Sequence, residues 1–182
     1  LLLAREAPRG PVRRFSLGAT PFVMDALQGL ALSPDGGRLV FRGRGEDGVL
    51  RLYERPLDSL ETRALPGTEQ GWLPFFSPDG AWLGFFTQGS LKKLALSGGA
   101  PLTVAPVTAA TGGTWLSDGT IVFASEAKGL ERVDASGGAP EALTRPGQGP
   151  MPLVTSPWAL PGGRALLVGL RRGGGFFDVA VF

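Results

Sequence analysis

The sequence predicts an all-β fold, a partial β-propeller of about four blades with four antiparallel strands in each. The first observation behind this prediction is the content of Gly and Pro, 29 and 16 of 182 residues, which is too high for a helical bundle. The second is a turn signal that recurs at a nearly constant spacing. The third is a short apolar run on each side of every turn, which is typical of buried strands joined by a hairpin.

The turn signal is Ser-Pro-Asp-Gly, which occurs twice intact and twice degraded, at residues 33–36, 77–80, 116–119 and 160–163. The third turn positions are 35, 79, 118 and 162, so the steps between them are 44, 39 and 44 residues. A second marker, Ser-Gly-Gly-Ala-Pro, occurs at 97–101 and again at 136–140, a step of 39. Two independent markers with a common spacing indicate a structural repeat.

Each position of the turn has a physical role. Proline at the second position presets φ, aspartate at the third binds backbone amides of the turn, and glycine at the fourth accepts positive φ. The later copies depart from the pattern, with Ser117 in place of Pro and Gly162 in place of Asp. We predict a structural turn role for Pro34, Asp35, Gly36, Pro78, Asp79, Gly80, Asp118, Gly119, Pro161 and Gly163.

The strands follow from the turns. The first strand of each blade precedes the turn, and the expected segments are 30–32, 72–76, 114–116 and 158–160. The second strand follows the turn, at 38–41, 82–86, 120–123 and 165–168. The third strand alternates polar and apolar residues, at 49–54, 91–96 and 130–135, and the fourth is suggested at 62–65, 102–104 and 141–144. Apolar inner strands and more polar outer strands are expected of a propeller.

The fourth blade reaches only its third strand, at 178–182. Its fourth strand is missing unless residues 12–17 supply it, so we expect an open arc whose terminal blades expose apolar faces. Such a segment is expected to self-associate through these open edges, most simply as a two-fold pair of arcs approximating a ring of about eight blades.

Ser-Pro-Asp-Gly followed by a short apolar strand resembles the TolB-type, WD-like propeller repeats of bacteria. The sequence from Arg14-Phe15-Ser16-Leu17 to Thr68 resembles the propeller C-terminal to bacterial transmembrane serine/threonine protein kinases. Arg-Pro-Leu-Asp at 55–58 and the segment 75–80 belong to this resemblance. The resemblance extends from Val12 over nearly the whole chain. It implies a non-catalytic sensor or protein-interaction module on a membrane-anchored kinase, located on the extracytoplasmic face of the membrane.

The resemblance also divides the chain. Residues 1–11 are expected to be a linker, in which the apolar tetrad 1–4 is either the end of a transmembrane helix or an arbitrary boundary. Residues 12–182 are expected to form the propeller. One alternative is the propeller of a prolyl-oligopeptidase-like serine peptidase, and another is a TolB-like periplasmic scaffold protein, so a periplasmic or cytoplasmic location stays open.

The composition excludes several chemistries. Without His there is no Ser-His-Asp triad, histidine base or His-ligated zinc, and without Cys there is no disulfide, thiolate site or cysteine nucleophile. The formal net charge is +2, and ten Arg lie between Arg5 and Arg63. Because acidic residues are interleaved with them, we interpret these Arg as solvated strand faces and predict no nucleic-acid partner.

Residues 43–48, Gly-Arg-Gly-Glu-Asp-Gly, match the G-x-G-x-x-G pattern of a phosphate-binding loop. A dinucleotide site needs a helix after the glycines, whereas residues 49–53 have a strand pattern. The other protein-kinase motifs are missing from the sequence, and Glu46 and Asp47 at the tip would repel phosphate. We therefore expect a plain hairpin loop.

Two further groups of residues have both a functional and a structural interpretation. Asp35, Asp79 and Asp118 are candidates for catalytic or calcium-binding carboxylates, but they lie one blade apart, which favours the turn role. Four tryptophans are candidates for stacking a ligand at one mouth of the ring. The four are Trp72, Trp82, Trp115 and Trp158. All of them except Trp82 are interpreted as holding similar repeat positions, which favours packing between blades. We predict no catalytic, cofactor-binding or metal-binding residue, and the ligand or partner stays open.

Overall fold

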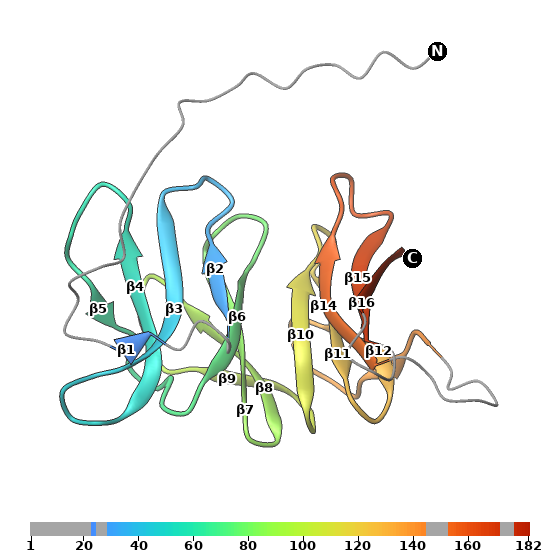
Figure 1. Cartoon of the computed structure of the whole chain (residues 1–182), viewed down its shortest axis with the longest axis horizontal. Coiled ribbons are helices and arrows are strands. Elements are labelled where there is room, and N and C mark those ends of the chain that lie inside the picture. Colours follow the sequence, from blue (N-terminus) through green and yellow to red (C-terminus); the bar gives the residue numbers. More distant parts are fainter. Residues whose placement is uncertain (1–22, 25–28, 145–152, 172–176) are drawn as a thin grey trace, which may run out of the picture.

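The computed structural model describes residues 23–24, 29–144, 153–171 and 177–182. Within these ranges all regular secondary structure is β-strand (Figure 1). The strands form four antiparallel sheets arranged as the four blades of a β-propeller. The predicted all-β fold and the number of blades are confirmed. No helix in the described ranges is long and apolar enough to cross a membrane. The expected linker and the segment 12–17 lie outside the described residues.

The first two blades contain the two intact turns. Blade 1 consists of β2 (Leu30–Leu32), β3 (Arg38–Arg44), β4 (Leu50–Pro56) and β5 (Arg63–Ala64), with the short β1 (Val23–Met24) paired to the far end of β3. Blade 2 consists of β6 (Trp72–Phe76), β7 (Trp82–Thr87), β8 (Ser90–Ala95) and β9 (Leu102–Pro106).

The other two blades follow the same order of strands. Blade 3 consists of β10 (Ala110–Trp115), β11 (Thr120–Ser125), β12 (Gly129–Asp134) and β13 (Glu141–Ala142). Blade 4 has three strands among the described residues, β14 (Leu153–Ala159), β15 (Leu166–Arg171) and β16 (Phe177–Val181). In every blade the strand before the turn is the inner one, and β2, β6, β10 and β14 lie toward the middle of the molecule (Figure 1).

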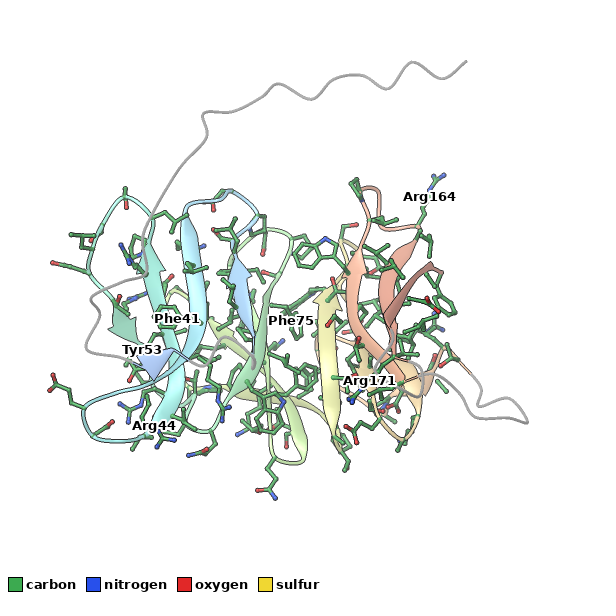
Figure 2. The ribbon with its side chains drawn as sticks, in the orientation of Figure 1. Phe41, Arg44, Tyr53, Phe75, Arg164 and Arg171 are labelled. Atoms are coloured by element: carbon green, nitrogen blue, oxygen red, sulfur yellow. The ribbon has the colours of Figure 1, made fainter. Side chains whose placement is uncertain are left out.

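The core lies between the blades. Neighbouring sheets bury apolar side chains face to face, as stacked sheets do. Between blades 1 and 2 this cluster includes Val40, Leu52, Phe76, Leu83 and Phe85. Between blades 2 and 3 it includes Phe75, Phe86, Leu91, Ile121 and Phe123, and between blades 3 and 4 it includes Val122, Ala124, Leu130, Val154 and Val168. Figure 2 shows side chains filling the spaces between the sheets.

The Ser-Pro-Asp-Gly turns are closed by local hydrogen bonds. Ser77 Oγ donates to Asp79 at 2.5 Å, the Ala81 amide donates to Asp79 at 3.0 Å, and the Trp82 amide donates to Ser77 Oγ at 2.9 Å. The turn at Asp35 has the same contacts with Ser33, Gly37 and Arg38. Gly36 and Gly80 both have a φ of 69°, a conformation in which a residue with a side chain would be strained. The chemistry of the turn therefore explains why it recurs at the tip of each inner hairpin.

Candidate functional site

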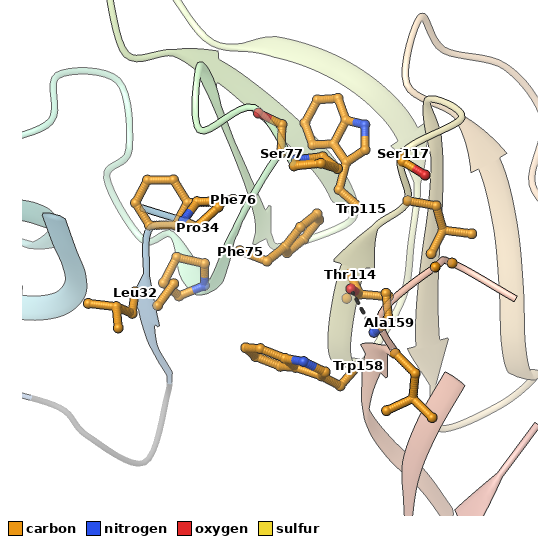
Figure 3. Close-up of a pocket in the computed structure, with 18 of the residues that line it drawn as sticks. Leu32, Pro34, Phe75, Phe76, Ser77, Thr114, Trp115, Ser117, Trp158 and Ala159 are labelled. Atoms are coloured by element: carbon orange, nitrogen blue, oxygen red, sulfur yellow. Dashed lines mark hydrogen bonds between the residues drawn. The ribbon is translucent and has the colours of Figure 1, made fainter. Parts of the chain in front are cut away.

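The inner strands of all four blades surround a pocket of about 350 Å³ (Figure 3). Each inner strand pairs with its own blade on one side only, so its other edge faces the axis of the propeller. Among the described residues the inner strands contact one another in the order β2, β6, β10 and β14. The pocket is lined by residues that include Leu32, Phe75, Ser77, Thr114, Trp115, Ser117 and Trp158.

Close approach of backbones brings the inner strands together at two of the three internal interfaces. A Cβ on Gly29 would lie 2.9 Å from Leu73 Cα, and a Cβ on Gly112 would lie 2.7 Å from Ser156 Cα. Leu73 and Ser156 have positive φ angles of 50° and 48°, and each precedes a proline. The glycine of one blade thus accommodates the left-handed X-Pro bulge of the next blade.

This pairing has a signal in the sequence that our sequence analysis missed. Gly29, Leu73, Gly112 and Ser156 each lie six residues before the third turn position of their blade, at 35, 79, 118 and 162. Blades 1 and 3 carry glycine there, whereas blades 2 and 4 carry an X-Pro pair. The propeller is therefore built from two alternating kinds of blade.

Among the described residues that line the pocket, none is Asp, Glu, Lys, Arg or His, so this part of the lining is uncharged. The Thr114 hydroxyl accepts a hydrogen bond from the Ala159 amide at 3.2 Å (dashed line in Figure 3). The Ser77 hydroxyl donates its hydrogen bond to Asp79 within the turn. Apolar walls with a few hydroxyl and indole groups suit an uncharged, largely apolar ligand.

The tryptophans differ more from one another than the sequence analysis supposed. Trp72, Trp115 and Trp158 lie seven (79 − 72), three (118 − 115) and four (162 − 158) residues before the third turn position. Their interpretation as equivalent residues is wrong. Trp72 and Trp115 are partly buried against the cluster between blades 2 and 3. Trp158 is 67% exposed and projects into the pocket opposite Leu32 (Figure 3).

The fourth tryptophan lies away from the pocket. The Trp82 ring is covered by the Lys93 ammonium, which lies 4.8 Å from the ring centroid. Trp82 is not among the residues that line the pocket. Only Trp115 and Trp158 are therefore placed to contact a ligand there.

The G-x-G-x-x-G segment forms the hairpin loop between β3 and β4, in which Arg44 pairs with Leu50. Asp47 accepts hydrogen bonds from the Val49 amide at 3.0 Å and from the Arg51 guanidinium at 2.5 Å. These two bonds lower the pKa of Asp47 below its usual value. Asp47 is thus hydrogen-bonded within the loop, which connects two strands and lacks the helix of a dinucleotide site.

The turn aspartates show a similar electrostatic pattern. Hydrogen bonds from Ser33 and the Gly37 amide lower the pKa of Asp35, and hydrogen bonds from Ser77 and the Ala81 amide lower that of Asp79. Asp118 accepts the Thr120 amide at 2.9 Å but has no serine partner, because Leu116 stands where the turns at 33–36 and 77–80 have Ser. Within the described ranges, no three or more carboxylates lie close enough to hold a metal ion.

The chain is similar in fold to solved propellers, although no protein-family model and no curated protein matches its sequence. A putative TolB from Agrobacterium tumefaciens superposes with a TM-score of 0.69 at 18% identity, over 84% of this chain and 60% of that one. TolB from Acinetobacter baumannii gives 0.65 at 19% identity, over 82% of this chain and 39% of that one. The chain thus spans less than two thirds of either protein.

A third similar structure is the β-propeller domain of the Trilobed protease from Pyrococcus furiosus, which has an open velcro topology. It gives a TM-score of 0.56 at 12% identity, over 84% of this chain and 53% of that one. At these identities the likeness establishes the propeller fold alone.

Proposed function

We propose that this chain is a non-catalytic β-propeller module that binds an uncharged, apolar ligand or protein segment in its axial pocket. The observation that carries the proposal is the lining of that pocket, in which the described residues come from four blades and carry no ionisable side chain. Trp158 supplies an exposed aromatic surface at its rim. Aromatic side chains with an accessible face are effective anchors for apolar and aromatic groups.

Tryptophan fluorescence with capped tetrapeptides tests this proposal. We expect an acetylated and amidated peptide containing Phe and Pro to shift the emission in a saturable way. Trp158→Ala should weaken binding at least tenfold, and Trp82→Ala should leave the affinity unchanged because Trp82 lies outside the pocket. If Trp158→Ala binds the peptide as tightly as the original chain, the axial pocket is not the binding site.

The proposed lack of catalysis rests on composition, since His and Cys are missing from the sequence. The purified chain should neither hydrolyse peptides or esters nor transfer phosphate from ATP. Turnover that co-purifies with the chain and disappears on substitution of one of its carboxylates would show that the module is an enzyme.

For the parent protein we propose a membrane-anchored bacterial serine/threonine kinase that carries this module as an extracytoplasmic sensor. The support is the resemblance of the segment from Arg14 to Thr68 to such propellers. The gene sequence around this segment is the test, and we expect a kinase domain followed by a membrane helix upstream of residue 1. A downstream serine hydrolase domain would instead establish the peptidase alternative, which the likeness to the Trilobed protease propeller favours as the second candidate. An upstream signal peptide and α/β domain would establish a TolB-like periplasmic protein.

A further inference from the structure

Among the described residues that line the axial pocket, the side-chain hydrogen-bond donors available to a ligand come from blades 3 and 4. Blades 1 and 2 line it with leucine, alanine, proline and phenylalanine, and with Ser77, whose hydroxyl donates within its own turn. Blade 3 contributes the Thr114 and Ser117 hydroxyls and the Trp115 indole, and blade 4 contributes the Trp158 indole. The pocket thus has one apolar wall and one wall that carries donors (Figure 3).

These donors are not used inside the protein. The Thr114 hydroxyl accepts the Ala159 amide at 3.2 Å, which leaves its own hydrogen for a ligand. Within the described ranges no hydrogen bond engages the Ser117 hydroxyl or the indole N–H of Trp115 or Trp158. Trp158 is 67% exposed, so most of its ring is accessible as well.

Side-chain acceptors are scarce in the same lining. The described residues include no carboxylate, amide or imidazole, so the hydroxyl oxygens are the side-chain acceptors that they offer. A ligand rich in N–H groups would leave some of them without a partner, and an unpaired buried donor costs free energy. The ligand that fits brings apolar surface and acceptors, and few donors.

The backbone of β14 is already bonded to blade 3, which disfavours addition of a peptide to it as a further strand. The Ala159 amide donates to the Thr114 hydroxyl, and the Val154 carbonyl accepts from the Thr111 hydroxyl at 2.8 Å. A peptide strand that paired with these two groups would displace both threonines. A ligand that needs no strand pairing leaves them in place.

We propose that the axial pocket binds a proline-rich segment of a partner protein in the polyproline II conformation, a ligand class that rests on the proposed function. Proline has no N–H, and a polyproline II helix has no internal hydrogen bonds, so its carbonyl oxygens are free to accept. These carbonyls accept from Trp115, Trp158 and Ser117, and the proline rings lie on the exposed indole and against the apolar wall. Aromatic-lined grooves recognise such segments in other domains, and the segment is ordered before it binds.

Isothermal titration calorimetry of the full chain with two capped tetrapeptides tests the proposal. The first peptide is acetylated and amidated tetraproline. The second is acetylated and amidated Thr-Phe-Thr-Val, which is uncharged and has an aromatic side chain but carries N–H donors and favours an extended strand. We expect tetraproline to bind about tenfold more tightly, because the second peptide leaves N–H groups without acceptors in the pocket.

Substitutions that remove one donor and keep the shape of the side chain separate hydrogen bonding from apolar contact. Trp115→Phe keeps an aromatic ring without the N–H, and Ser117→Ala removes a hydroxyl at an exposed turn position. Each should weaken tetraproline binding about three- to tenfold, as the loss of one hydrogen bond does. Trp82→Phe and Ser97→Ala are the matched controls, because neither residue lines the pocket, and both should leave the affinity unchanged.

The results distinguish this proposal from the proposed function. If Thr-Phe-Thr-Val binds as tightly as tetraproline and Trp158→Ala weakens its binding, the pocket is the site but the preference for proline is wrong. Tetraproline binding that neither Trp115→Phe nor Ser117→Ala weakens would also overturn the proposal, because the donors would then not hold the ligand. If neither peptide binds, the proposed function fails together with this inference.

Discussion

Truncation of Phe75 and of Trp158 should have very different effects on stability, although the two residues hold the same repeat position. Phe75 is 8% exposed and lies between Phe86, with ring centroids 5.9 Å apart, and Gly113 of the next blade. Removal of a buried phenyl ring leaves a cavity, so Phe75→Ala should lower the free energy of unfolding by about 3–5 kcal/mol. Trp158 is 67% exposed and buries only a third of its surface. Full burial of a large apolar side chain contributes roughly 1.5–3 kcal/mol, so Trp158→Ala should cost about 1 kcal/mol or less.

Urea unfolding followed by far-UV circular dichroism measures both losses. Both variants are measured at several protein concentrations, so that any contribution of association to stability is seen as a dependence on concentration. The slope of the transition should stay the same while the midpoint moves. Equal losses for the two variants would refute the reasoning, because they would mean that Trp158 is covered as fully as Phe75.

Three other perturbations have expected outcomes. Asp79→Ala should lower the midpoint of urea unfolding, because the hydrogen bonds from Ser77 and the Ala81 amide are lost, and it should leave peptide binding unchanged. A loss of binding at unchanged stability would make Asp79 a residue of the binding site. Gly112→Ala should lower the free energy of unfolding in urea by about 1–3 kcal/mol more than Gly98→Ala, because a Cβ on Gly112 would lie 2.7 Å from the Ser156 backbone while Gly98 faces open space. Equal losses for the two variants would contradict the contact between blades 3 and 4. The folded-state pKa values of Asp35 and Asp79 are lowered, so both contribute stability above the unfolded pKa of about 3.9 and lose it as the pH falls through the folded value. Replacing both with Asn should therefore flatten the acid limb of a curve of stability against pH. An unchanged acid limb would contradict the pKa shifts.

The strands next to the turns could be predicted because turn chemistry is local, although β14 begins at Leu153, before the expected segment 158–160, and β1 (Val23–Met24) was not predicted. The Ser-Pro-Asp-Gly turns at 33–36 and 77–80 hold their aspartates with groups no more than two residues away, so the contacts of these aspartates are local. The strands on either side then follow from the apolar runs. Even the short β5 (Arg63–Ala64) and β13 (Glu141–Ala142) fall inside the segments 62–65 and 141–144 that the sequence suggested.

The tryptophans show where a prediction from residue type fails. Trp115 and Trp158 are one position apart in the repeat, three and four residues before the third turn position. Side chains on successive positions of a strand point to opposite faces. Trp115 therefore packs back onto the cluster with blade 2, whereas Trp158 lies on the opposite face of its sheet and is 67% exposed. Counting from the turn, rather than matching the residue type, would have separated them.

Residue types in the sequence are enough to predict the turns, the strands next to them, the number of blades that they mark and the chemistries that a chain without His or Cys lacks. These properties depend on residue types and on contacts between near neighbours in the chain. The packing of the blades sets which side chains line the axial pocket, how Gly112 accommodates Ser156, and that Trp158 is exposed while Phe75 is buried. Burial depends on what the neighbouring blade places against a residue, and that neighbour lies some forty residues away in the sequence.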